Sequence, residues 1–363
     1  MEIKQQHPGT ILFFRMGDFY ELFHEDAEVA APVLGLALTS RDKNAKNPIP
    51  MAGFPWHALE DNLRIMLKSG FKVTVAEQEK ELREGAKLLE RVVTRIYTPG
   101  SLYEESLLNS SERSVLSSIV LAKSSLSMAI IDSSTGESWA STWMDDERFS
   151  SLEDELLRWN PAEIVISPKD AENDQLCTIF ANLSDCVISQ HNVNKKRRIE
   201  RLETILEVSD LGHLDLDNSP LSIEAAGFAA DYLAEVHFKQ NIPLRDLQIV
   251  EETGHLVVDQ TTLRNLEITN TLSGEYDGSL ISSMNYCRTA MGRRLMKTWL
   301  LRPLHQIEAI ELRHNAVKTL KSSSKRLDML RQSLTGLRDL ERLSTQLAYN
   351  RSNARDLLAT ALA

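Results

Sequence analysis

The sequence predicts a multidomain protein in which two mixed α/β domains precede a mostly helical domain. Three observations support this prediction. Short apolar runs alternate with helical patterns through the first two thirds of the chain. Proline and glycine interrupt these patterns repeatedly as far as Pro303. No proline follows Pro303, and apolar residues then recur at helical spacing to the end of the sequence.

The first domain is predicted over residues 1–105. The apolar run 11–14 has the length of a buried strand. Leucines at helical spacing predict a helix over residues 58–68. Alternating apolar and polar residues predict strands at 71–75 and 92–97. Together these elements indicate a mixed α/β domain.

The segment after the first strand carries the most informative pattern in the chain. Gly17-Asp18 is a turn signal, Asp18 stands at the position of a helix N-cap, and Glu21 follows three residues later as in a capping box. We therefore expect a strand, a tight turn and a helix that begins at Phe19. On local grounds, Phe19 would be the first core residue of that helix. The apolar positions of its expected stripe are Phe19, Phe23, Ala27, Ala30 and Leu34.

The second domain is predicted over residues 112–240. Strand patterns followed by an alternation of helix and strand are typical of an α/β domain. The expected strands are 118–122, 126–133, 138–142 and 163–167, and the expected helices are 148–159 and one that starts near Ser222. Pro243 marks the next boundary, so the helical domain is predicted over residues 244–363, with a helix at 292–301 and long helices after it.

Composition limits the classes of function. Hydrophobic residues make up 42% of the 363 residues and charged residues 26%, as in ordinary globular proteins, and no apolar run reaches membrane-spanning length. The net charge of −11 is concentrated in residues 111–240, where 23 Asp and Glu face 11 Lys and Arg. That segment is therefore a poor candidate for binding phosphates. The three cysteines, Cys177, Cys186 and Cys287, show no metal-binding spacing and are typical of a reducing cytoplasm.

Five collinear motifs resemble the MutS family of bacterial DNA mismatch repair proteins. The first is R-M-G-D-F-Y-E-L-F at 15–23. The others are P-M-A-G-F-P-W-H at 50–57, T-P-G-S-L at 98–102, L-R-N-L-E-I-T at 263–269 and M-G-R-R-L at 291–295. The resemblance implies a mismatch-binding domain, a ribonuclease-H-like connector domain and an incomplete helical core or lever domain. It also implies binding to duplex DNA with mismatches or small insertion loops, to initiate repair.

The resemblance also implies roles for individual residues. Phe19 and Glu21 match the pair that reads mismatches, with Phe19 as a wedge that kinks deformable DNA. Near phosphates, Glu21 is expected to be neutral or to share a proton. Met16 and Tyr20 either hold the Phe19 ring or pack in the core. The loop cations Arg41, Lys43 and Lys46 either contact DNA phosphates or face solvent. His57, with no partner at catalytic spacing, is expected to be structural.

Two alternatives remain open at this stage. Asp132 ends a strand of the second domain, where a metal-dependent nuclease would place a carboxylate, although no convergent partner set is evident. A truncated relative that makes only protein contacts is the other alternative. The basic run 195–198 could bind nucleic acid, but a solvated loop and helix start is the favoured interpretation. No metal site is predicted.

The chain ends inside a helical pattern and is therefore expected to be a fragment. No G-x-x-x-x-G-K-[ST] phosphate loop occurs in the sequence, so no catalytic residues and no cofactor are assigned to it. The resemblance implies ATP and Mg²⁺ for an ATPase domain outside this sequence, a homodimer and a MutL-type partner. It further implies a cytoplasmic bacterial protein that joins the nucleoid when bound to DNA.

Overall fold

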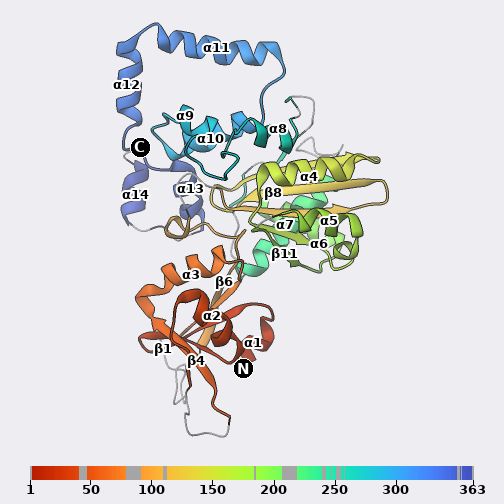
Figure 1. The fold of residues 1–363 in the computed structure, drawn as a ribbon, viewed down its shortest axis with the longest axis vertical. Coiled ribbons are helices and arrows are strands. Elements are labelled where there is room, and N and C mark those ends of the chain that lie inside the picture. Colours follow the sequence, from red (N-terminus) through yellow and green to blue (C-terminus); the bar gives the residue numbers. More distant parts are fainter. Residues whose placement is uncertain are drawn as a thin grey trace.

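The computed structural model describes most of the chain. The described residues are 2–40, 47–78, 91–108, 113–183, 185–206, 219–238, 243–245, 247–250, 255–256, 258–349, 352 and 354–361. They form two mixed β-sheets with their helices, followed by a series of helices (Figure 1). This architecture confirms the predicted fold class. Among the helices of the described part, none is both long enough and apolar enough for a membrane span.

The first sheet has the strand order β3-β4-β2-β1-β5-β6. Strands β1, β2, β4 and β3 pair antiparallel to one another, whereas β5 runs parallel to β1. Its core lies between one face of the sheet and helices α2 (Glu25–Leu34) and α3 (Leu59–Lys68). The strands are β1 (Ile11–Met16), β2 (Phe19–Phe23), β3 (Thr39–Ser40), β4 (Pro50–Pro55), β5 (Val73–Gln78) and β6 (Arg91–Tyr97), and α1 (Glu2–Gln6) precedes them.

The prediction of a helix that begins at Phe19 is wrong. Residues Phe19–Phe23 are strand β2, and the helix that follows starts only at Glu25. Asp18 therefore lies in a hairpin turn and caps no helix, and no capping box forms with Glu21. The expected burial of Phe19 is also wrong, because its side chain is 48% exposed. Pairing of β2 with strands on both sides overrides the local helical pattern.

The second sheet has the order β11-β10-β7-β8-β9-β12. Three consecutive antiparallel strands, β7 to β9, are extended by the parallel strands β10 and β11 at one edge and by the parallel strand β12 at the other. The arrangement of β7 to β11 is that of the ribonuclease-H-like fold that the resemblance implied. Helices α4 and α5 contribute to one core and α6 and α7 to another. The strands are β7 (Val115–Leu121), β8 (Ser125–Asp132), β9 (Glu137–Met144), β10 (Glu163–Ile166), β11 (Val187–Gln190) and β12 (Leu247–Ile249). The helices are α4 (Arg148–Trp159), α5 (Asp174–Ala181), α6 (Lys195–Leu206) and α7 (Pro220–Val236).

The basic run 195–198 was only partly interpreted correctly. It does begin helix α6, and the Lys196 side chain is exposed. Arg198, however, is buried, with Nη1 3.0 Å from a Glu224 carboxylate oxygen and its guanidinium 3.8 Å from the centre of the Phe228 ring. The solvated interpretation is therefore wrong for Arg198, because one face of α6 packs against α7.

The chain after Gln260 is mostly helical, as predicted. None of the described residues in α11 or α12 is buried, so the apolar residues of these helices are exposed or only partly covered. Both helices lie at the end of the molecule opposite the first sheet (Figure 1). The helices are α8 (Gln260–Asn265), α9 (Leu280–Met284), α10 (Ala290–Leu301), α11 (Ile307–Lys321), α12 (Ser324–Leu334), α13 (Leu340–Ala348) and α14 (Ala354–Ala361).

A fully buried carboxylate, Glu163 on β10, joins the two sheets. From the first sheet's side, the Lys72 ammonium lies 3.3 Å from it, and the Gly100 backbone N–H donates to it over 3.2 Å. From its own side, the hydroxyls of Ser189 and Tyr232 donate to it. Burying a charge is tolerated only when such partners replace water. Glu163 therefore fixes how the first sheet meets the second.

A second junction joins three parts of the chain through aromatic rings. Tyr103, after the first sheet, stacks on Tyr349 of the helical part at a centroid distance of 4.0 Å. The ring of His237, at the end of α7, meets both rings edge-on. Arg95 of β6 lies 4.1 Å from the Tyr103 ring centre. Burial, reinforced by the Arg95 charge, lowers the pKa of His237 to about 3.

The strand assignment of residues 19–23 gives a stability prediction. Leu22→Ala removes a fully buried side chain and should lower the free energy of unfolding by about 2–5 kcal/mol. Phe19→Ala truncates an exposed side chain and should change it by less than about 0.5 kcal/mol. Urea denaturation of both variants measures the difference. Equal losses would contradict the assignment, because a helix starting at Phe19 buries that ring.

The buried His237 predicts a pH dependence. Unfolded, this histidine has its ordinary pKa of 6.5, whereas folding lowers the pKa to about 3. Between these values the unfolded chain binds a proton that the folded chain rejects, so stability decreases as pH falls below 6.5, by up to about 1.4 kcal/mol per pH unit. His237→Gln should flatten this slope between pH 6.5 and 5 in urea titrations. His57→Gln, at an exposed histidine, is the control, and an equal effect there would refute the assignment.

Candidate nucleic-acid interface on the first sheet

The hairpin between β1 and β2 turns in two residues, Gly17 and Asp18. Met16 pairs with Phe19 across the turn. Gly17 has a φ of 60°, whereas Asp18 is not among the residues with positive φ. A glycine with positive φ at the first position is typical of the type II′ turn, whose twist suits a tight hairpin. The sequence therefore allows β2 to fold back on β1 at once.

Alternation along β2 separates its side chains onto two faces. Tyr20 and Leu22 are buried in the core under α2 and α3. Phe19 and Glu21 consequently share the opposite face, where Phe19 is exposed and Glu21 is partly exposed. The structure thus brings the two predicted mismatch-reading residues together on one side of one strand.

The two residues expected to flank the wedge lie differently. Met16 is directly opposite Phe19 on β1 and shares its face of the sheet. Tyr20 points into the core, so for this residue the packing interpretation is confirmed. Its hydroxyl donates to the Glu77 carboxylate on β5, and burial together with this hydrogen bond raises the pKa of Tyr20. Tyr20 thereby fixes the strand that carries Phe19.

A second exposed aromatic residue, Trp56, lies beside the hairpin and was not assigned from the sequence. Its side chain is 52% exposed, and its backbone N–H donates to the Asp18 carbonyl over 2.9 Å. The Arg15 guanidinium lies 5.3 Å from the centre of its ring, in cation–π range. An exposed aromatic residue next to a strand end has no periodic signal, but Trp56 belongs to the P-M-A-G-F-P-W-H motif, and that membership was the signal available in the sequence.

A glycine keeps this face of β2 open beside Glu21. Gly53 on β4 pairs directly with Glu21. A Cβ atom at Gly53 would lie 3.0 Å from the Tyr20 carbonyl oxygen and 3.7 Å from Glu21 Cγ. Any larger side chain there would crowd the Glu21 carboxylate. The absence of a side chain therefore leaves Glu21 accessible from the open face.

Arg91 brings a positive charge to this face, whereas Arg15 pairs with Tyr20 and its guanidinium lies 5.3 Å from the centre of the Tyr20 ring, on the other face. The Arg91 guanidinium lies 5.6 Å from the centre of the Phe14 ring, and Phe14 pairs with Glu21 across the hairpin. The predicted phosphate contacts Arg41, Lys43 and Lys46 lie outside the described residues. His57 is exposed in the short 3₁₀ helix Trp56–Ala58.

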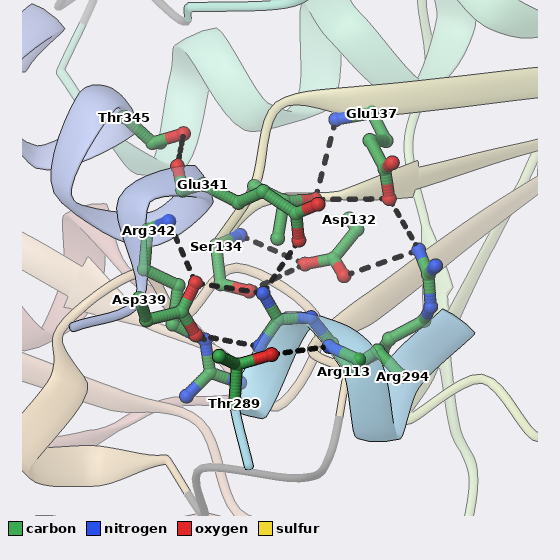
Figure 2. A network of polar contacts seen from close by, with 12 residues as sticks. Arg113, Asp132, Ser134, Glu137, Thr289, Arg294, Asp339, Glu341, Arg342 and Thr345 are labelled. Atoms are coloured by element: carbon green, nitrogen blue, oxygen red, sulfur yellow. Dashed lines mark hydrogen bonds and ion pairs between the residues drawn. The ribbon is translucent and has the colours of Figure 1, made fainter. Parts of the chain in front are cut away.

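Asp132 does not show the surroundings of a nuclease centre. It is fully buried, and the backbone N–H and hydroxyl of Ser134 donate to its Oδ1. Arg113 lies 3.6 Å from its Oδ2 and 2.6 Å from the Glu137 carboxylate, where a metal would compete with the guanidinium (Figure 2). Within the described residues, no group of three or more His, Cys, Asp or Glu side chains is arranged to hold a metal. The geometry thus gives the nuclease alternative no support.

Comparison with known proteins relates the chain to one family along its length. The model of MutS domain I matches residues 1–106, that of MutS domain II matches residues 114–245, and that of MutS domain III matches residues 261–363. Curated relatives named DNA mismatch repair protein MutS also match. Those of Acaryochloris marina, Halothermothrix orenii and Methanococcoides burtonii are 35%, 34% and 32% identical over 99%, 98% and 99% of this chain. The chain spans 42%, 40% and 41% of their respective lengths.

Proposed function

Because the chain belongs to the MutS family of DNA mismatch repair proteins, we propose that it recognises mismatched or unpaired bases in duplex DNA. The observation that carries the proposal is the position of Phe19 and Glu21 on the open face of β2. The large apolar side chain of Phe19 is exposed to solvent on one face of β2, and the other face of this strand is buried in the core. An exposed aromatic on a rigid strand is suited to insertion between bases.

The proposed selectivity comes from the deformability of DNA. Unstacking a base step to admit a ring costs a few kcal/mol in paired DNA. A mismatch has already lost part of its pairing and stacking, so the same insertion costs less there. A Phe19 wedge therefore favours mispairs without reading a base code. Trp56, beside the hairpin, would add apolar contact in the same groove irrespective of the mispair.

Glu21 has the role that is hardest to explain by charge alone. An ionised carboxylate is repelled by phosphates, and a bound duplex therefore favours its protonated form. In that form Glu21 would donate a hydrogen bond to a ring nitrogen of the displaced base. Gly53 supports this role because it leaves space beside the carboxyl group.

The wider activity of the protein is also proposed from the family. We propose that these residues are the front part of a homodimer that cooperates with a MutL-type partner. ATP and Mg²⁺ would be bound by residues outside this sequence, which contains no phosphate loop. The boundaries 1–105, 112–240 and 244–363 remain our proposed division into mismatch-binding, connector and core domains.

Phe19→Ala should lower affinity for DNA with one unpaired base by about 1–3 kcal/mol, the usual contribution of one aromatic–base stack. Affinity for the matched duplex should change little, so discrimination decreases. Fluorescence anisotropy with two duplexes of the same sequence, with and without the extra base, measures both affinities. Trp56→Ala is the matched control and should weaken binding to both duplexes alike. Unchanged affinity for both duplexes in Phe19→Ala would contradict the wedge and favour a protein that makes only protein contacts.

Glu21→Gln should keep or strengthen binding to matched DNA and reduce discrimination. The amide is neutral at every pH and meets no repulsion from phosphates, so it no longer penalises paired DNA. The same anisotropy measurement applies, with Glu28→Gln on an exposed turn of α2 as a control for the loss of one negative charge. If the Gln variant discriminates as well as the parent, the proton-sharing role is wrong.

A further inference from the structure

A cleft of about 640 Å³ lies where the three parts of the chain meet. Lys68, the last residue of α3, contributes from the first part. The end of α4 and the turn after it, residues 158–162, contribute from the second part, and α10 from the third. The volume falls within the range of small-molecule sites, about 300–1,000 Å³.

Basic side chains outnumber acidic ones in the described lining of the cleft. One acidic side chain, Asp185, belongs to it. The basic side chains are Lys68, Arg113, Arg158, Arg294, Lys297 and Arg302. They come from segments more than 200 residues apart in a chain whose net charge is −11. The fold therefore gathers positive charge at a site that the overall composition does not suggest.

Two of the arginines share a single carboxylate. Glu155 accepts from both Arg158 and Arg302, so the pair retains one excess positive charge. The Nε of Arg158 is buried without a hydrogen-bond partner in the described part of the chain. The positive charge also affects the pKa of the nearby His255. Its pKa is lowered by burial and then by Arg302, Arg313 and Arg158.

The other two arginines are held from behind. Arg294, which is buried, donates to both Asp339 oxygens over 2.6 and 2.7 Å and to Glu341 over 2.5 Å. Arg113 donates to Glu137 and lies 3.6 Å from Asp132, so carboxylates behind the cleft offset the charge of both arginines (Figure 2). The Arg113 and Arg302 guanidiniums also lie 5.9 and 5.3 Å from the centre of the Trp159 ring. Such contacts fix the guanidinium planes before a ligand arrives, which reduces the entropy lost on binding.

We propose that this cleft binds a small anion with linked phosphate groups, either free or as the tail of a nucleotide. Arginine forks and lysine ammoniums are the usual protein partners of phosphate oxygens. Several cations distributed over one cleft match several linked phosphates better than one. Because the cleft lies between three parts of the chain, the ligand would bind all three together. This inference does not depend on the role of Phe19.

Isothermal titration calorimetry of the full 363-residue chain with pyrophosphate, ATP and AMP tests the proposal. Pyrophosphate and ATP should bind, and AMP, with one phosphate, should bind at least about tenfold more weakly. Equal affinity for ATP and pyrophosphate assigns the site to the phosphates alone, whereas tighter ATP binding assigns it to a nucleotide. AMP binding as tightly as ATP would overturn the linked-phosphate requirement, and absence of pyrophosphate binding would overturn the site.

Charge variants at exposed rim positions localise the binding without disturbing the core. The double variant Lys68→Glu, Lys297→Glu should weaken pyrophosphate binding about tenfold or more, whereas Asp185→Asn should strengthen it, because each changes the local potential with opposite sign. Lys321→Glu at the end of α11 is the control for net charge and should have no effect. Equal losses in the control and the double variant would show general charge attraction and refute the cleft as the site.

Discussion

The arrangement of the two sheets depends on one buried carboxylate, Glu163. Its partners come from both sides of the junction, with Lys72 and Gly100 on one side and Tyr232 on the other. The contact requires a glycine at position 100, because a Cβ there would lie 2.8 Å from Glu163 Cβ. Removing one partner of such a buried charge leaves the rest unsatisfied, which is why paired burial is costly to break. The close backbone approach therefore explains the glycine of the T-P-G-S-L motif.

This junction is connected to the open face of the first sheet by regular structure. The Lys72 carbonyl accepts from the Ile11 backbone N–H, where β1 begins beside β5. Strand β1 then pairs with β2, which carries Phe19. Between Glu163 and Phe19 the chain thus offers paired strands and no long loop. Rigid connections of this kind are what a site needs when a side chain must be held against a deforming partner.

The sequence predicts the order of the helices and strands well, but it predicts less well how they pair and which of their side chains are buried. Helix α4 was predicted with its observed bounds, because its apolar residues recur with a clear helical period. The segment 19–23 satisfies two periods at once, since Phe19 and Phe23 are four apart while Tyr20 and Leu22 alternate with their neighbours. Gly17-Asp18 between two apolar runs was the missed signal for a hairpin.

The burial of Arg198 and the position of the cleft had no signal in the local sequence. The burial of Arg198 depends on which face of α6 meets α7, and four consecutive basic residues show no preferred face. Lys68 and Arg302 line the same cleft, although they are 234 positions apart in the sequence, and only folding brings them to one site. Sequence motifs therefore identified the residues of the open sheet face, which lie in one short stretch, but not a cleft assembled from three distant segments.

The open face combines a rigid strand, β2, with an exposed apolar side chain, Phe19. The proposed contact with DNA needs both features. Phe19 is about half exposed, so contact with stacked bases would remove apolar surface from water and contribute favourable free energy. That gain can distort DNA only if the protein distorts less than the DNA does. Strand β2 is paired on both sides, by β1 and β4, and Tyr20 bonds beneath it to Glu77. A helix starting at Phe19 would have buried the ring, so the proposed role of Phe19 as a wedge depends on the hairpin turn at Gly17.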